Sequence, residues 1–406
     1  MARTSGPGEP APIAFAAAGS PGDFTSALYL GFWHGSESLR WTHLTTGTPA
    51  ALRPPTGAAA LESALGTLTG TGRALLFTST LHAFVDLFGS VWRGPGTILA
   101  DEHAYPIARW GMALAAQRGA RMRSFHHLDA GSLERRLGQS RARSPGVGEP
   151  WIVTDGFCPG CGRSAPLGAY ARAARRFGAK LVIDDTQSLG LYGRAAGTGA
   201  PYGLGGGGSM RRHGLERAEG VVLVASLAKA FGAPLAMVAG AASFVNALAE
   251  QSETRVHCSP PAAPALAAAE WALAVNAREG DALRSQLAAR VRTLRAELAA
   301  RGFAVRGGCF PMQRVPVRDA REARALHAAL RRRGVAVVVR RSRCNGEVSL
   351  TFVVTARHHA SDLRGAAAAL AAVVARRRGC RTEDGAGVIA GAFRRRSVDL
   401  HINLEA

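Results

Sequence analysis

Short apolar runs alternate with amphipathic stretches from about residue 60 to residue 255, and this alternation constrains the fold most. Helical patterns, for example residues 169–177, lie between the runs. Runs of this kind are typical of buried strands in a mainly parallel sheet that is covered by helices. We therefore expect an α/β fold, with strands at residues 74–78, 97–100, 151–154, 180–184, 221–225 and 236–239.

Polar residues follow several of these expected strands. In open sheets of this type, ligands bind beyond the carboxyl ends of the strands. The polar residues in such positions are Ser79, His103, Asp155, Asp184 and Ser226. We expect these residues to border a ligand site.

Lys229 indicates the chemistry of that site. The chain has only two lysines, Lys180 and Lys229, against 48 arginines, and Lys229 lies in the segment SLAKAFG after the expected strand 221–225. Arginine can replace lysine as a surface cation, but an amine that must lose its proton and attack a carbonyl has to be lysine. Lys229 is therefore predicted to form a Schiff base, with a leftover surface lysine as the alternative. Lys180 is interpreted as such a surface residue.

A carboxylate lies near this lysine in the expected fold. The strand 180–184 ends in Asp184 and Asp185, and Lys229 follows the next strand. A lysine and a carboxylate at neighbouring strand ends suit pyridoxal phosphate, because the lysine bonds the aldehyde and the carboxylate keeps the pyridine nitrogen protonated. The alternative is that the two aspartates cap a helix that follows the strand.

Composition limits the other classes of function. The 406 residues are 47% hydrophobic and 19% charged, which is typical of a globular chain with two or more domains. No apolar stretch is long enough for a membrane span, no signal peptide is expected, and six cysteines do not form a disulfide framework, so a cytoplasmic location is predicted. The net charge of +21 is spread along helical stretches, so we expect no nucleic-acid partner. A basic surface still attracts anionic partners such as a phosphate cofactor, coenzyme A or an acidic carrier protein.

The chain is expected to divide into four parts. Residues 1–45 form an N-terminal arm, residues 46–285 a large cofactor-binding domain, and residues 286–378 a small C-terminal α/β domain. The order of the tail, residues 379–406, is not predicted. Residues 262–300 are expected to form one or two long helices that bridge the domains.

Six segments in the same order resemble fold-type I pyridoxal-phosphate enzymes, and among them the α-oxoamine synthases most. This resemblance covers residues 28–375 and implies a large domain with a mainly parallel, seven-stranded sheet. The family includes 8-amino-7-oxononanoate synthase, aminoketobutyrate ligase and aminolevulinate synthase. The segments are YLGF (29–32), ALLFTSTLHA (74–83), DEHA (101–104), DDTQSLGLYG (184–193), ASLAKAFG (225–232) and SPP (259–261).

The resemblance implies a role for each matching residue. Lys229 would be the Schiff-base lysine, Asp184 would pair with the pyridine nitrogen, and His103 would stack on the ring and take part in catalysis. Taken alone, His103 is an ordinary surface or core histidine. The backbone N–H groups of Thr80 and Leu81, at a helix start, would bind the phosphate.

Four more residues are assigned to the cofactor site. The Ser226 hydroxyl would also bind the phosphate, and Ser79 and Asp155 belong to segments that match the family's cofactor site. His257 stands where family members often have a threonine that reaches the neighbouring subunit's phosphate, which implies a homodimer.

Three positions depart from the family pattern. Gln187 replaces a histidine that bonds the cofactor's phenolic oxygen, and glutamine can donate a hydrogen bond but cannot titrate near neutral pH. Pro159 replaces the usual serine. Thr351 stands where the family has an arginine that clamps the substrate carboxylate, and the candidates to substitute for it are Arg340, Arg341 and Arg343.

The resemblance implies an acyltransferase that condenses an amino acid with an acyl thioester and releases carbon dioxide, acting in specialised metabolism. The thiol carrier would be coenzyme A or a carrier protein. The departures at Gln187 and Thr351 leave open an aminotransferase, or another enzyme acting on an atypical amine or ketone. A third alternative, which rests on the net charge alone, is a catalytically silent scaffold that binds nucleic acid.

No metal site is expected. The pair Cys158-x-x-Cys161 has no second pair nearby, so it is interpreted as a tight turn lined by small residues. The pairs His126-His127 and His358-His359 are expected to be solvated, because adjacent side chains point in different directions.

Overall fold

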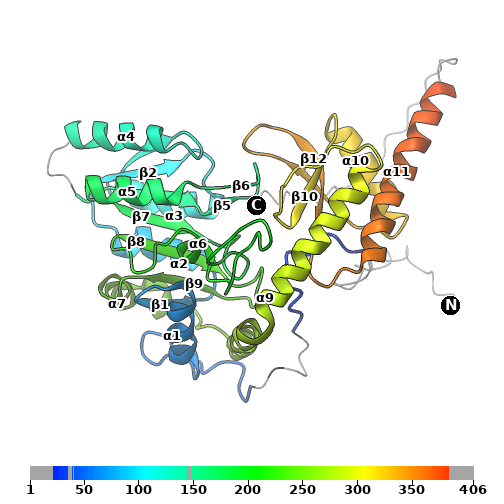
Figure 1. Ribbon diagram of the computed structural model, residues 1–406. Helices are drawn as coiled ribbons and strands as arrows, with labels where there is room; N and C mark the ends of the chain where they lie inside the picture. The colour runs from blue at the N-terminus through cyan, green and yellow to red at the C-terminus, as the bar shows by residue number, and fades with distance from the viewer. Residues whose placement is uncertain (1–21, 35–38, 40, 144–147, 384–406) are drawn as a thin grey trace, which may run out of the picture.

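The computed structural model describes residues 22–34, 39, 41–143 and 148–383. Most of the expected N-terminal arm and residues 384–406 of the tail lie outside the described residues. Two sheets of different size, joined by one long helix, organise the described part of the chain (Figure 1).

The larger sheet has seven strands in the order β1-β9-β8-β7-β4-β2-β3. Strand β9 runs antiparallel to both of its neighbours, whereas the pairs β8-β7, β7-β4, β4-β2 and β2-β3 are parallel. The expected mainly parallel sheet is thus confirmed. Its strands are β1 (Arg73–Phe77), β2 (Thr97–Asp101), β3 (Arg121–Phe125), β4 (Trp151–Asp155), β7 (Lys180–Asp184), β8 (Val221–Ser226) and β9 (Ala236–Gly240).

The sequence analysis missed strand β3. It lies at the edge of the sheet and pairs only with β2 among the sheet strands. Its residues alternate arginine with other side chains, and only Phe125 is buried. An edge strand needs no continuous apolar run, because it has a neighbouring strand along one edge only and its side chains are more exposed to solvent.

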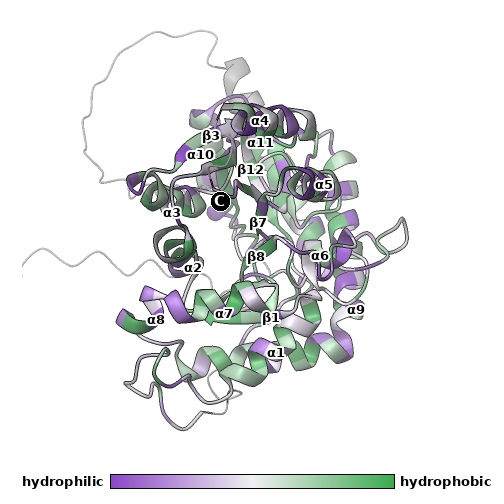
Figure 2. Ribbon diagram, turned by 90° about the vertical axis from the view of Figure 1, so that its left-hand side faces the viewer, coloured by the Kyte–Doolittle hydropathy of each residue, from purple (hydrophilic) through white to green (hydrophobic). Residues whose placement is uncertain are grey.

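Helices cover both faces of this sheet. Alternate strand residues supply two separate hydrophobic clusters, as expected from the period of two in a strand. Helices α1 (Ala58–Thr69), α4 (Ala130–Arg143) and α5 (Leu167–Phe177) contribute to the cluster on one face, and α2 (Thr80–Asp86), α3 (Pro106–Gln117) and α7 (Ala242–Gln251) to the other. Figure 2 shows hydrophilic and hydrophobic residues mixed along these helices, as expected for helices with one buried side.

The smaller sheet is antiparallel, in the order β10-β12-β11. It is formed by β10 (Met312–Pro316), β11 (Val338–Arg341) and β12 (Val348–Val353), with helices α10 (Ala320–Arg331) and α11 (Ala360–Glu383) beside it. The described N-terminal residues join this part of the chain, because Phe24 is fully buried and its N–H donates to the carbonyl of Ala336.

A single long helix, α9 (Ala263–Ala299), links the two sheets (Figure 1). It continues without a break through residue 285, so the predicted boundary there falls inside a helix. The four-part division stays a prediction. The remaining elements are the π-helix η2 (Leu87–Val91), the short helices α6 (Gly208–Arg212) and α8 (Glu253–His257), and the hairpin of β5 (Phe157–Cys158) and β6 (Arg163–Ser164).

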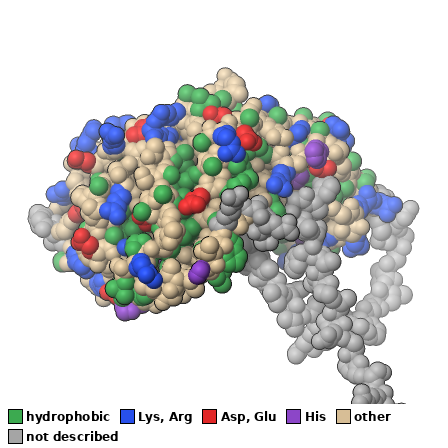
Figure 3. All heavy atoms as spheres, turned by 90° about the horizontal axis from the view of Figure 1, so that it is seen from below, with side chains coloured by type: hydrophobic (Ala, Val, Ile, Leu, Met, Phe, Trp, Pro, Cys, Tyr) green, Lys and Arg blue, Asp and Glu red, His purple; other side chains and the backbone are tan. Residues whose placement is uncertain are grey.

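On the face shown in Figure 3, lysine and arginine side chains are scattered among other types. Within the described part of the chain, every helix is too short or too polar to cross a bilayer.

Candidate functional site

A cavity of about 160 Å³ lies at the carboxyl ends of β4, β7 and β8. This is where an open parallel sheet presents its ligand site. Six of the predicted site residues border it together with four others. The lining residues are Thr80, Tyr105, Asp155, Phe157, Pro159, Asp184, Thr186, Gln187, Ser226 and Lys229.

Lys229 is a partly buried amine in this cavity. It follows the end of β8 in a turn, and the backbone N–H of Gly232 donates to its carbonyl. Burial lowers the pKa of the Lys229 ammonium, and the positive charge of Arg340 adds to this, while Asp184 opposes both. A lowered pKa increases the share of neutral amine, which is the form that attacks a carbonyl.

Asp184 is buried at the end of β7, the strand beside β8. Its Oδ1 accepts a hydrogen bond of 3.1 Å from the N–H of Thr186. Burial raises the pKa of Asp184, whereas hydrogen bonds from Thr186 and the charge of Lys229 lower it. Such a carboxylate gains stability from a cationic N–H donor in the cavity, because the donor offsets the cost of burial.

Gln187 is oriented by Tyr29, which lies 158 residues earlier in the chain. The Tyr29 hydroxyl donates to Oε1 of Gln187 at 2.7 Å, and both side chains are buried. Burial raises the pKa of Tyr29, so it remains a donor at ordinary pH. Because Oε1 is occupied in this way, the amide nitrogen of Gln187 is the group that can donate to a ligand in the cavity.

Asp155 is a second carboxylate in the cavity, paired in register with Asp184. Its Oδ1 accepts a 3.2 Å hydrogen bond from the N–H of Tyr105. Burial and the neighbouring charge of Asp184 both raise the pKa of Asp155. Two adjacent carboxylates, one of them buried, favour a single negative charge, so this pair suits one cationic group.

Two of the three residues predicted to bind the phosphate line the cavity. Thr80, the first residue of α2, and Ser226 both border it. Ser79 caps α2, since its Oγ accepts from the N–H of His82 at 3.4 Å. Leu81 is 39% exposed and is not among the lining residues.

The structure separates two other predicted residues from the cavity. His103 is not among the lining residues, and its ring packs edge-on against His127, with centroids 4.8 Å apart. His257 is an exposed residue on α8 that pairs with Glu253 at 3.3 Å. Among the described residues, neither histidine forms a hydrogen bond, ion pair or ring contact with Lys229 or Asp184, so their assigned roles stay predictions.

Two buried arginines, Arg314 and Arg340, lie near Thr351, the position at which the family has an arginine for the substrate carboxylate. Thr351 is buried on β12, and its direct neighbours across the sheet are Arg314 on β10 and Val338 on β11. Arg314 donates to the carbonyl of Gly160, and Arg340 donates to that of Pro159 at 3.2 Å. Arg340 is buried and Arg341 is exposed.

Two expectations about histidine pairs are wrong in part. His126 and His359 are exposed as predicted, but the side chain of His127 is only 12% exposed and His358 is buried. His127 bonds Asp101, and His358 packs flat on Phe24, with centroids 4.3 Å apart. In each pair, tertiary packing covers one of two adjacent side chains that point in different directions.

Several functional residues had no signal of their own in the sequence. Tyr29 was noted only as part of a family segment, and Tyr105, Phe157 and Thr186 were not assigned to the site. Thr186 joins two strand ends, because its Oγ1 accepts from the N–H of Ser226 at 3.0 Å. Only the position of Tyr105, four residues after the end of β2, is a local signal for a place at the sheet edge.

These residues fit pyridoxal phosphate. A partly buried amine, a buried carboxylate at the next strand end and an amide donor share one cavity at the start of a helix. The bound cofactor supplies an aldehyde for the lysine and a pyridine ring that accepts electrons from the substrate.

Comparisons with known proteins agree with this fit. The family model for aminotransferases of class I and II matches residues 36–370. The 8-amino-7-oxononanoate synthase of Alkalilimnicola ehrlichii is 32% identical over 78% of this chain and 76% of its own length. That of Methylococcus capsulatus is 32% identical over 82% and 80%.

Solved structures share the fold. Serine palmitoyltransferase of Sphingomonas wittichii superposes with a TM-score of 0.75 at 20% identity, over 87% of each chain. The 8-amino-7-oxononanoate synthase of Francisella tularensis gives 0.68 at 17% identity, over 87% of this chain and 98% of that one. The chain therefore belongs to the class I and II aminotransferase family and is a pyridoxal-phosphate-dependent transferase of fold type I.

Proposed function

We propose that the protein condenses an amino acid with an acyl thioester and releases carbon dioxide, as α-oxoamine synthases do. The observation that carries this proposal is the cavity in which Lys229, Asp184 and Gln187 meet. The relatives named 8-amino-7-oxononanoate synthase support it, since they match about three quarters of the chain. Aminotransferase activity is the alternative.

Three residues of the chain would act on the substrate and the cofactor, one by accepting a proton and two by binding polar atoms of the ring. The Nζ of Lys229, with its pKa lowered by burial, accepts the proton from the α-carbon of the amino acid. Asp184 would hold the positive charge at the pyridine nitrogen, and the amide of Gln187 would donate a hydrogen bond to the cofactor's oxygen. Because glutamine does not titrate near neutral pH, we assign proton transfer to Lys229 or a nearby base and not to Gln187.

The carboxylate of the amino acid would be bound by Arg340. This residue is buried, and its positive charge lowers the pKa of Lys229 and opposes the rise in the pKa of Tyr29. It would take over the clamp role from position 351, where threonine has no positive charge to pair with a carboxylate. Arginine suits this task because its planar fork binds a carboxylate through two hydrogen bonds.

We base a proposal for the assembly and the location on the same family. A homodimer would place His257, exposed on α8, near the phosphate of the neighbouring subunit. We also infer the cytoplasm as the location and specialised metabolism as the context. The division into residues 1–45, 46–285, 286–378 and 379–406 is retained as a domain proposal.

The test is a matrix of amino acids and acyl thioesters, with both coenzyme A and carrier-protein thioesters. Condensation releases free thiol and carbon dioxide together, and neither appears when one substrate is left out. Conversion of the cofactor to its amine form by an amino acid alone, without thiol release, would instead support the aminotransferase. Lys229→Ala should abolish either reaction, whereas Lys180→Ala, the only other lysine, serves as the matched control.

A further inference from the structure

Four side chains with metal-binding atoms meet outside the cavity: His127, Cys158, Cys161 and Cys344. One ligand atom from each lies within 4.8 Å of all the others. The Nε2 of His127 is 3.4 Å from Sγ of Cys161 and 3.6 Å from Sγ of Cys344. The Sγ atoms of Cys158 and Cys344 are 3.5 Å apart.

These distances match the edges of a zinc tetrahedron. Zinc binds sulfur at about 2.3 Å and nitrogen at about 2.0–2.1 Å, so tetrahedral angles place two sulfurs about 3.8 Å apart and a nitrogen and a sulfur about 3.6 Å apart. A disulfide requires a sulfur–sulfur distance of about 2.05 Å. The geometry therefore suits a shared ion and not a bond between two of the cysteines.

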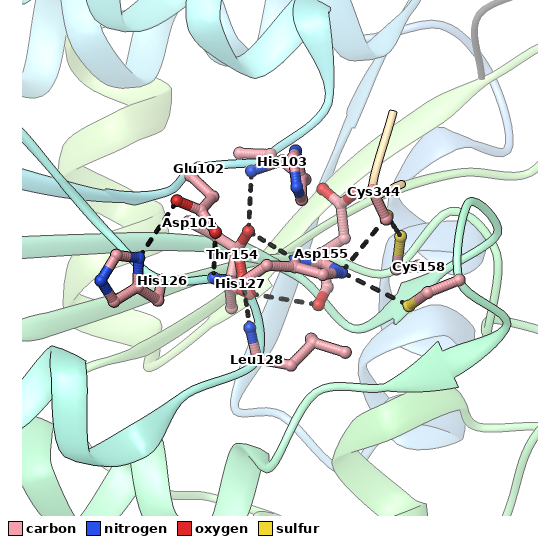
Figure 4. Close-up of polar contacts among 12 residues, drawn as sticks. Asp101, Glu102, His103, His126, His127, Leu128, Thr154, Asp155, Cys158 and Cys344 are labelled. Atoms are coloured by element: carbon pink, nitrogen blue, oxygen red, sulfur yellow. Dashed lines mark hydrogen bonds and ion pairs between the residues drawn. The ribbon is translucent and has the colours of Figure 1, made fainter. Parts of the chain in front are cut away.

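A buried carboxylate orients the histidine toward the thiols. Oδ1 of Asp101 lies 2.7 Å from Nδ1 of His127, and the Asp101 side chain is only 2% exposed. The other oxygen of Asp101 accepts from the N–H of Leu128 at 3.1 Å. A carboxylate on one ring nitrogen holds the proton there and leaves the other nitrogen as a metal ligand. Figure 4 shows His127 between Asp101 and the sulfur atoms.

The loop around the cysteines is shaped for close approach. A Cβ added at Gly160 would lie 2.9 Å from Sγ of Cys344 and 3.3 Å from Sγ of Cys158, so only glycine leaves room for the cluster. The carbonyl of Gly160 accepts hydrogen bonds from Arg314 and from Oγ of Ser342, the latter at 3.2 Å. Arg314 thus lies beside a cluster that would carry negative charge once its thiols are ionised.

We propose that His127, Cys158, Cys161 and Cys344 bind one zinc ion in a closed structural site. Three thiolates and one imidazole form a ligand set that selects zinc over harder cations such as magnesium. All four positions around the metal are taken by protein atoms, so the ion has no place for a substrate. This proposal departs from the expectation of no metal, although the expected tight turn is present, since the N–H of Gly162 donates to the carbonyl of Cys158 at 2.8 Å.

The ion would fix one wall of the cavity. His127 follows β3, Cys158 ends β5, and Cys161 lies in the turn of the β5–β6 hairpin. Cys344 lies in the turn between β11 and β12. Phe157 and Pro159 flank Cys158 and both line the cavity. Zinc would therefore join the two sheets of the protein at the segment that shapes its ligand site.

The first experiment measures zinc in the purified protein after gel filtration with a chelator. We expect about one zinc ion per chain, with or without pyridoxal phosphate. Cys344→Ser should lose the zinc, and Cys309→Ser, at an exposed cysteine away from the cluster, should keep it. Asp101→Asn should weaken zinc binding by about 10- to 100-fold.

A second measurement uses the wild-type protein, so its result does not depend on whether the variants fold. X-ray absorption at the zinc edge of the wild-type protein should show a first shell of three sulfurs and one nitrogen, and cobalt in place of zinc should give the absorption bands of a tetrahedral thiolate complex. A zinc-free wild-type protein, a disulfide between Cys158 and Cys344, or a shell rich in oxygen would each overturn the proposal.

Discussion

The hydroxyl of Tyr29 provides the sharpest test of how the cavity is built. Tyr29 is fully buried, and its ring packs edge-on against Phe310 with centroids 5.6 Å apart. Tyr29→Phe keeps this ring and removes only the donor to Oε1 of Gln187. The buried oxygen then lacks its partner, which costs about 1–3 kcal/mol, or roughly 5- to 150-fold in the unfolding equilibrium.

Urea unfolding of the cofactor-free protein measures this loss, and titration with pyridoxal phosphate measures its effect on the site. We expect lower stability and weaker cofactor binding, because the free amide of Gln187 no longer has a fixed orientation. Gln187→Met in the Tyr29→Phe background should cause little further loss of stability in the cofactor-free protein, since the two changes remove the same hydrogen bond.

The matched control is Tyr202→Phe. The Tyr202 hydroxyl donates to the carbonyl of Cys309 at 2.5 Å, and Tyr202 is not among the residues that line the cavity. This variant should lose stability and keep cofactor affinity. If Tyr29→Phe leaves both stability and affinity unchanged, or if its effect on stability adds fully to that of Gln187→Met, the proposed orientation of Gln187 is wrong.

Three further predictions concern single side chains. Borohydride reduction of the holoenzyme should attach the cofactor to the peptide that contains Lys229, and a label on Lys180 instead would contradict the assignment. Burial raises the pKa of Asp185 to about 7, so this carboxyl binds more protons in the folded than in the unfolded state at pH 4–7. Its contribution to stability is therefore present at low pH and falls as pH rises, by up to about 1.4 kcal/mol per pH unit, and Asp185→Asn should remove this slope in urea titrations at several pH values. Arg284, which is 2% exposed, donates to Gly190 O and Asn276 Oδ1, both at 2.8 Å, so Arg284→Met should destabilise the protein by about 3 kcal/mol by leaving those buried acceptors unpaired. A melting temperature equal to that of wild type would refute this last estimate.

The strands of the large sheet were predictable because burial on both faces leaves a continuous apolar run. All six expected strands begin and end within one residue of an observed strand, and the segment 180–184 coincides with β7. Strand β3 was not predictable in this way, since its edge position allows arginines at alternate residues. Lys229 and Asp184 were found because their residue types and their places after strands are both local features.

Contacts between distant segments could not be predicted in the same way. Tyr29 and Gln187 are 158 residues apart, and His127 and Cys344 are 217 residues apart. The pair Cys158-x-x-Cys161 was interpreted as a turn because its other two ligand partners lie on other loops. Likewise, Arg314 could not be placed beside Thr351 before the register of β10 and β12 was known.

The amino acid sequence by itself determined the fold class, the reactive amine and the carboxylate that accompanies it. These follow from hydrophobic periodicity and from residue chemistry, which act over a few neighbouring residues. Tertiary structure alone decided which side chain orients Gln187 and which cysteines lie beside His127. Such contacts depend on strand order and loop conformation, and only the folded chain brings those loops together.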